Sequence, residues 1–174
     1  MRVEYRHGPH LSHMSDQDYH VQVIQHLTER LREEPDDRRA YFLRGNAYLD
    51  HGDYQAAIDD YSRAIDLQPD AMAYNNRGIA YRNLKDPQRA MADYRQALAL
   101  DIDYRDAYNN LGLVLSDQSA FEEAIRCFNR AIDLDPSYWY AYNHRATALW
   151  GLGRREEARR DYETVRNLLN PSNL

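Results

Sequence analysis

The chain has 174 residues, 43% hydrophobic and 29% charged, which is enough for one domain or one short array of repeats. Its net charge of −6 argues against a nucleic acid partner, because phosphate binding favours a basic surface. No apolar stretch is long enough to cross a bilayer, and one cysteine, Cys127, excludes a disulfide framework and a multi-cysteine metal site. We expect a cytoplasmic protein without membrane contact.

Residues 1–14 show no apolar periodicity and are expected to form a flexible tail. The tail contains His7, His10 and His13, but no carboxylate or thiol completes a site there, so we expect no bound metal. Residues 16–34 show apolar side chains at helical spacing, and Pro35 ends the pattern. We interpret residues 15–37 as a helix that caps the N-terminal end of the structure.

The rest of the chain repeats itself four times. Gly45, Gly78, Gly112 and Ala146 are spaced by 33, 34 and 34 residues, and an alanine on their C-terminal side recurs at the same spacing, at Ala57, Ala90, Ala124 and Ala158. Two markers that stay in step over four copies indicate a repeat architecture. We divide the copies at 38–70, 71–104, 105–138 and 139–171.

Each copy has an aromatic, a small and a second large residue in its first half, then alanine, an aromatic and, in most copies, alanine in its second half. In the first copy these are Tyr41, Gly45, Tyr48, Ala57, Tyr61 and Ala64, followed by Pro69. The pattern resembles the tetratricopeptide repeat family. The resemblance implies an all-α fold, a right-handed α-solenoid in which about four antiparallel helix pairs stack behind the N-terminal helix.

Two irregularities in the copies carry local predictions. One residue fewer separates Pro69 from Gly78 than separates the matching positions later in the chain, so we expect a shorter loop there. Ile102 replaces the proline that ends the first and third copies, which predicts that the helix before it continues toward Tyr104.

Two positions vary together between the copies. The residue before the small position is Arg44, Arg77 and Arg145 in three copies and Leu111 in the third. The position 16 residues later is Asp60, Asp93 and Asp161 in the same three copies and Cys127 in the third. We expect an Arg–Asp pair across three hairpins and a Leu–Cys contact in the remaining one, which makes Cys127 a packed thiol.

The resemblance also implies where a partner binds, because the family's solenoid holds peptides in a concave groove lined by the first helix of each pair. The groove positions carried over to this chain are Arg39, Phe42, Asn46, Leu49, Met72, Asn75, Ile79, Arg82, Asp106, Asn109, Leu113, Tyr140, Asn143 and Trp150. The repeated asparagines can bond a peptide backbone, and the apolar members can hold anchor side chains. The competing interpretation is a solvated helix face.

Some family members bind the C-terminal carboxylate of a chaperone through Lys, Asn and Arg at fixed positions. Asn46 and Asn76 match two of them, but Phe42, Asp106 and Asn110 stand where Lys, Lys and Arg are required. We therefore expect a different kind of peptide partner.

The C-terminal end lacks an evident capping helix. Apolar side chains of the last repeat are left at the end of the array, at Tyr162, Val165, Leu168 and Leu169. Two interpretations of this face stay open: its polar neighbours keep the helix soluble, or the face forms a homodimer. The sequence has no phosphate-binding loop, dinucleotide fingerprint or zinc-protease helix, so we expect a protein-binding adaptor that is not an enzyme and needs no cofactor, with a self-assembly module as the alternative.

Overall fold

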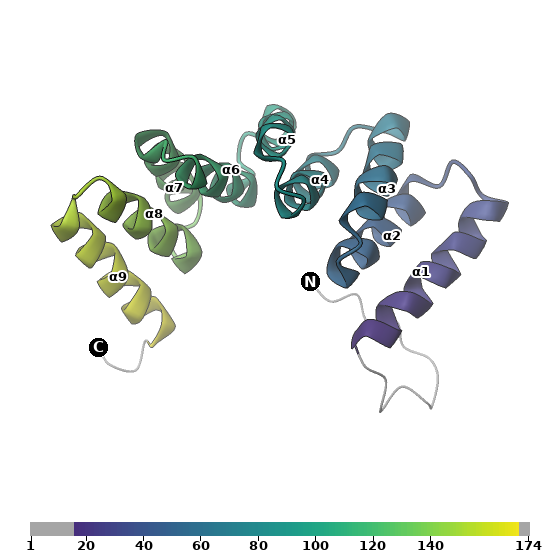
Figure 1. The fold of residues 1–174 in the computed structure, drawn as a ribbon, viewed down its shortest axis with the longest axis horizontal. Coiled ribbons are helices and arrows are strands. Elements are labelled where there is room, and N and C mark those ends of the chain that lie inside the picture. Colours follow the sequence, from purple (N-terminus) through teal and green to yellow (C-terminus); the bar gives the residue numbers. More distant parts are fainter. Residues whose placement is uncertain (1–15, 171–174) are drawn as a thin grey trace.

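The computed structural model describes residues 16–170, which form nine α-helices and no strand. The helices are α1 (Asp16–Glu33), α2 (Arg38–His51), α3 (Tyr54–Leu67), α4 (Ala71–Asn83), α5 (Pro87–Leu100), α6 (Arg105–Asp117), α7 (Phe121–Leu134), α8 (Trp139–Gly151) and α9 (Arg155–Leu169). They follow one another along an arch (Figure 1). The tail expected over residues 1–14, with His7, His10 and His13, lies outside the described residues.

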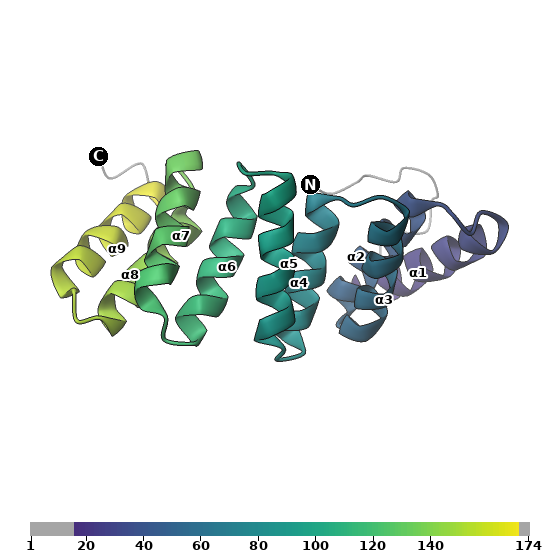
Figure 2. The ribbon, with the colours of Figure 1, turned by 90° about the horizontal axis from the view of Figure 1, so that it is seen from above.

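Helices α2 to α9 form four antiparallel pairs, called here the first (α2–α3), second (α4–α5), third (α6–α7) and fourth (α8–α9) pair. Each first helix also contacts the first helix of the next pair, whereas among residues 16–170 no such contact joins the second helices. The first helices therefore line the inner side of the arch, and Figure 2, seen from above, shows α5 in front of α4 and α3 in front of α2. The predicted all-α, right-handed solenoid is confirmed.

Each of the first three pairs is held by a glycine on the first helix packed against an aromatic ring on the second. A Cβ added to Gly45, Gly78 or Gly112 would lie 2.8, 2.7 or 2.6 Å from the ring of Tyr61, Tyr94 or Phe128 respectively. Contacts this short leave no room for a larger residue. All three rings are fully buried. The equivalent ring of the fourth pair, Tyr162, is 41% exposed because no further pair covers it.

The connections between pairs agree with one sequence expectation and correct the other. The loop from α3 to α4 has three residues, against four between α5 and α6 and between α7 and α8, so the predicted shorter loop is confirmed. The prediction that the helix continues past Ile102 was wrong, since α5 ends at Leu100. Asp101 has an extended backbone, and its carboxylate accepts a hydrogen bond from the backbone N–H of Asp103.

Asp135 closes the equivalent turn after α7 in the same way, by accepting from the backbone N–H of Ser137. A short aspartate turn therefore ends both helices, and proline is not required for it.

The helix expected over residues 16–34 is α1, which ends one residue earlier, at Glu33. Its Leu27 and Leu31 are buried against Ala40 of α2. The hydroxyl of Thr28 also accepts a hydrogen bond of 2.9 Å from Arg44. Helix α1 thus packs against α2 at the N-terminal end of the array, as expected of an N-terminal cap. None of the described helices combines the length and apolar character needed to cross a membrane.

Candidate functional site

The predicted Arg–Asp pairs are present in three hairpins and form a structural frame behind the inner surface. Arg44 donates two hydrogen bonds of 2.7 Å to the carboxylate of Asp60, one from Nε and one from Nη2. The pairs Arg77–Asp93 and Arg145–Asp161 have the same two-bond geometry at 2.7–2.8 Å. Burial raises the pKa of Asp60 even though Arg44 bonds to it, so the pairing only partly offsets the cost of burying the carboxylate.

Each of these arginines also reaches back to the preceding helix. Arg44 Nη1 donates to the Thr28 hydroxyl, and the equivalent bonds of Arg77 and Arg145 run to Ser62 and Asn129 at 2.9 and 2.6 Å. One guanidinium therefore connects three helices, its own, the paired helix and the one before. The comparison of the sequence copies missed this bond to the preceding helix. The acceptors Thr28, Ser62 and Asn129 lie 15 or 16 residues before their arginines, so the same alignment of copies could have found them.

The third pair lacks the charged frame for an identifiable reason. Leu111 is buried in the core, and Cys127 packs against the same cluster, so the predicted Leu–Cys replacement is confirmed. The residue at the Ser62 position is here Arg95, whose positive charge lies close enough to Cys127 to act on its pKa. An arginine at position 111 would meet a second cation in place of an acceptor. Burial raises the pKa of the Cys127 thiol to about 11, which keeps the thiol protonated at neutral pH.

Three of the predicted groove residues are large apolar side chains that are exposed to solvent. Met72, Tyr140 and Trp150 are 53%, 46% and 52% exposed, and all three belong to first helices. The remaining predicted groove residues differ in exposure: Arg39 is exposed, while Phe42, Asn46, Leu49, Ile79, Arg82, Asp106, Leu113 and Asn143 are half-buried. Phe42 packs against the core, with its ring centroid 5.9 Å from that of Tyr61.

Two predicted groove residues occupy a different place from the one expected. Asn75 and Asn109 are buried, with 3% and 4% of their surfaces exposed. Asn75 accepts a hydrogen bond of 2.9 Å from Asn110, and Asn109 lies 2.9 Å from Nδ1 of His144. These amides therefore join consecutive first helices and are not free to bind a peptide backbone. The repeating spacing assigned them to first helices, but it carried no information on how closely neighbouring helices approach.

The hydrogen bonds between consecutive first helices form a ladder along the array, and this ladder begins in the first pair with Asn46. Its side-chain oxygen accepts from the Tyr61 hydroxyl at 2.7 Å and from Asn76 at 3.0 Å. Asn46 and Asn76, the two residues that match the chaperone-tail positions, are thus bonded to each other. At the other end of the ladder, burial lowers the pKa of His144, so the imidazole is neutral at pH 7.

An aromatic cluster surrounds the start of α8. The rings of Trp139 and Tyr140 stack with centroids 3.7 Å apart, and the Tyr138 ring lies 5.6 Å from that of Tyr140. The guanidinium of Arg105 lies 4.0 Å from the Tyr138 ring centroid and is bonded to Asp106 and Asp135. This cluster gives the inner surface a rigid aromatic end beside an acidic side chain.

Comparison with known sequence families identifies the fold family. Models of the tetratricopeptide repeat match residues 24–71 and 42–105, residues 106–138, and residues 140–168. The chain belongs to the tetratricopeptide repeat family. No curated protein matches it in sequence. Among residues 16–170, no group of three or more His, Cys, Asp or Glu side chains could hold a metal ion.

Solved structures of other tetratricopeptide repeat proteins superpose on the chain. A crystal structure of MamA is 25% identical, with a TM-score of 0.80, and the match covers 92% of this chain and 98% of that one. The first repeat domain of Spaghetti (RPAP3), bound to the HSP90 peptide SRMEEVD, is 30% identical over 67% of this chain and 93% of that one, with a TM-score of 0.65. YrrB, described as having an unusual peptide-binding site, is 18% identical with a TM-score of 0.72, covering 90% of this chain and 85% of that one, and supports the fold alone.

Proposed function

We propose that the protein is a non-enzymatic adaptor whose inner surface binds a peptide segment of another protein. The observation that carries the proposal is the exposure of Met72, Tyr140 and Trp150 on the concave row of helices. Large apolar side chains exposed on a rigid, hollowed surface are typical of protein-binding sites. The peptide-bound structure of the RPAP3 domain supports the same use of this fold.

The burial of the two asparagines changes which side chains can recognise a peptide. Because Asn75 and Asn109 are bonded within the protein, anchor side chains contribute most of the recognition. The exposed Arg39 and the half-buried Asn143 remain as polar candidates. Such a surface predicts an affinity near micromolar, about 8 kcal/mol. The packed thiol of Cys127 agrees with a reducing cytoplasm as the place of action.

The test is a selection of binding peptides from a random display library, followed by calorimetry with the selected peptides. The variant Met72→Ala/Tyr140→Ala/Trp150→Ala should weaken binding at least about 10-fold, because each anchor loses its buried apolar area. The matched control is Leu100→Ala/Ile102→Ala, which removes similarly exposed apolar side chains from the end of α5 and the loop after it. Equal loss of binding in both variants, or none in either, would place the binding surface elsewhere.

A second candidate function is self-assembly through the C-terminal face. Tyr162, Leu168 and Leu169 of α9 are 41%, 36% and 51% exposed, and Val165 is half-buried beside them. Apolar side chains at the open end of a solenoid favour contact with another surface. Leu168→Glu/Leu169→Glu should convert a dimer to a monomer in light scattering while leaving peptide binding unchanged. A wild-type protein that is monomeric at high concentration would remove this candidate.

A further inference from the structure

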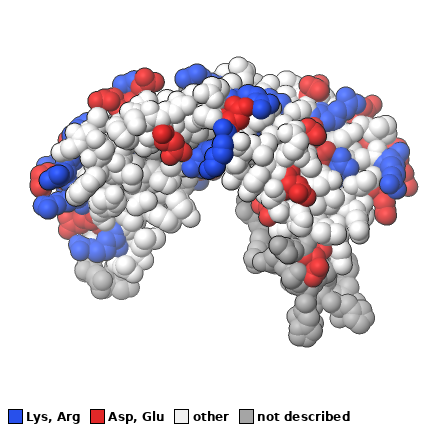
Figure 3. Space-filling view, viewed as in Figure 1, with Lys and Arg blue, Asp and Glu red and all other residues white. Residues whose placement is uncertain are grey.

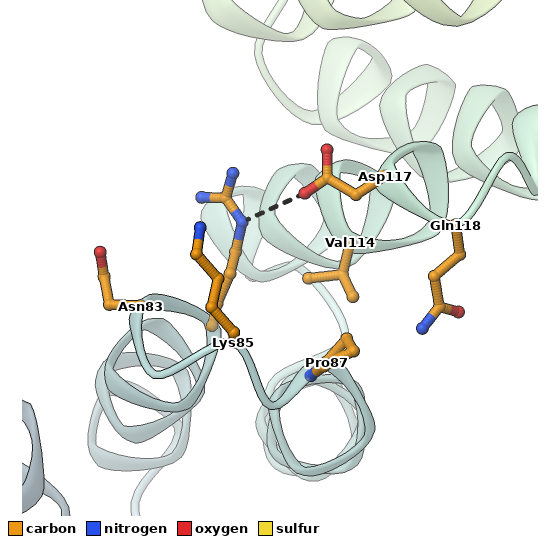
Figure 4. A pocket seen from close by; sticks show the side chains of 7 residues that line it. Asn83, Lys85, Pro87, Val114, Asp117 and Gln118 are labelled. Atoms are coloured by element: carbon orange, nitrogen blue, oxygen red, sulfur yellow. Dashed lines mark ion pairs between the residues drawn. The ribbon is translucent and has the colours of Figure 1, made fainter.

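A hollow of about 590 Å³ opens where α4 and α6 end side by side, in the middle of the arch. Figure 3 shows Lys and Arg side chains gathered at this point, with an acidic side chain next to them. Figure 4 shows the lining residues, with Lys85 beside the arginine that the dashed line joins to Asp117. Arg82 and Lys85 are its two cations and Asp117 its one anion, so the hollow has a surplus positive charge.

The charged groups of the hollow do not satisfy one another. Nε of Arg82 is covered by protein and has no hydrogen-bond partner, and the nearest oxygen of Asp117 is 3.7 Å away, too far for a hydrogen bond. The arginines of the Arg–Asp pairs contrast with it, because Arg44, Arg77 and Arg145 each make two short bonds to a carboxylate. Arg82 therefore has only a loose ion pair with Asp117, and its side chain remains 41% exposed at the hollow.

Lys85 occupies a backbone position that is unfavourable for its side chain. Its φ is +62°, and the equivalent residues of the first, third and fourth pairs are Gly52, Ser119 and Gly153, at φ of +94°, +61° and +75°. Glycine adopts this conformation at no steric cost, whereas a residue with a Cβ is strained there. Lys85 is also the only lysine in the chain. Because Ser119 has the same conformation in the third pair, strain alone assigns no role to Lys85, and its place beside Arg82 in the lining of the hollow is the observation that matters.

A second unpartnered donor lies behind the hollow. The Tyr94 hydroxyl is buried without a hydrogen-bond partner, whereas the equivalent hydroxyl of Tyr61 donates to Asn46. The position of Asn46 is taken in the second pair by Ile79, which offers no acceptor. Burial raises the pKa of Tyr94, and the positive charge of Arg82 acts in the opposite direction. The second pair is thus short of acceptors on its inner side.

We propose that this hollow binds the side-chain carboxylate of an aspartate or glutamate in the partner segment, with Arg82 and Lys85 as its direct contacts. The inference rests on the proposed function, since the segment must lie along the inner surface. A carboxylate supplies the missing acceptor, and charge-assisted bonds to guanidinium and ammonium are strong in a partly enclosed site.

Asp117 restricts the charge of the ligand. Two cations and one fixed anion suit a monoanion better than a phosphate dianion. The site is distinct from the ladder of Asn46 and Asn76, which belongs to the first and second pairs and is closed by its own hydrogen bonds.

The peptide selection described above provides the test when it is repeated on Arg82→Gln and Lys85→Gly. Wild type should select peptides enriched in Asp or Glu at one fixed position, and both variants should lose that enrichment. Changing the selected acidic residue to its amide should weaken binding to wild type about 10-fold or more and have little effect on Arg82→Gln. Arg126→Gln is the control, because it removes an exposed positive charge from α7, a second helix outside the predicted groove.

Lys85→Gly separates binding from folding, because glycine relieves the backbone at this position and should leave stability equal or higher. Selected peptides that bind without an acidic preference would overturn the inference and leave the adaptor proposal intact.

If no peptide is selected, the adaptor proposal fails. The carboxylate site in the hollow can then still be tested separately, through the single lysine Lys85. Protein with isotope-labelled lysine gives one NMR signal, that of Lys85. The protein is titrated with N-acetyl-glutamate amide while this signal is followed. A saturable shift that disappears in Arg82→Gln would support the carboxylate site. The same response to N-acetyl-glutamine amide, or none to either probe, would overturn it.

Discussion

The second and third helix pairs have the same backbone arrangement and different side-chain chemistry between their helices. The second is joined by the Arg77–Asp93 bonds, whereas in the third Leu111 and Cys127 pack into one apolar cluster. Both retain a glycine pressed against a fully buried ring, Gly78 on Tyr94 and Gly112 on Phe128. The small-residue and ring packing therefore sets the hairpin geometry, and the ion pair is an addition that one pair dispenses with.

The strongest test of this comparison removes the rings. Tyr94→Ala and Phe128→Ala should each lower the free energy of unfolding by about 3–5 kcal/mol, since both empty a fully buried site. Tyr162→Ala, in the same position of the fourth pair, should cost about 1 kcal/mol or less because that ring is partly exposed. Urea unfolding of the three variants checks the order. A small loss for Phe128→Ala would show that the rings do not determine the hairpin.

A smaller effect is expected when the charged pair is broken. Asp93→Ala should lower the free energy of unfolding by about 2–3 kcal/mol, because it leaves the largely buried Arg77 without its carboxylate. The double variant Arg77→Leu/Asp93→Cys imports the third pair's contact and should recover most of that loss. Urea unfolding of the single and double variants gives the coupling energy directly.

The reverse exchange should not be neutral. Leu111→Arg/Cys127→Asp introduces the second pair's residues into the third pair, where Arg95 replaces the acceptor that Ser62 provides to Arg77. The repulsion between two arginines should make this variant less stable than wild type, and adding Arg95→Ser should restore part of the loss. Equal stability of both exchanges would mean that the third partner of the arginines is unimportant.

Repeat spacing was sufficient to predict the helix pairs and the Arg–Asp frame, because both depend on contacts within one copy that recur at a fixed separation. The burial of Asn75 and Asn109 could not be read in this way, since it depends on how closely α4, α6 and α8 approach one another. The end of α5 was mispredicted because the turn is made by the Asp101 carboxylate and does not need proline. The hollow between α4 and α6 depends on side-chain positions contributed by two different repeats.

The smallest predicted effect compares two tyrosine hydroxyls at equivalent positions. Tyr61→Phe should lower the free energy of unfolding by about 1 kcal/mol, since the hydroxyl donates a 2.7 Å bond to Asn46. Tyr94→Phe should leave stability unchanged or raise it by up to about 1 kcal/mol, because the variant removes a buried hydroxyl that has no partner. Both substitutions preserve the ring that packs on the glycine, so differences in urea unfolding report the hydroxyl alone.

Equal losses for Tyr61→Phe and Tyr94→Phe would mean that the Tyr94 hydroxyl is satisfied in solution, for example by an enclosed water molecule. The second pair would then have its acceptor without a ligand, and the contrast with the first pair would disappear. Opposite signs would show instead that the exchange of Asn46 for Ile79 leaves a real deficit on the inner side of the second pair. That deficit lies in the same helix pair as Arg82. The sign of the change in unfolding free energy for Tyr94→Phe therefore tests whether this pair is organised for folding or for a bound acceptor.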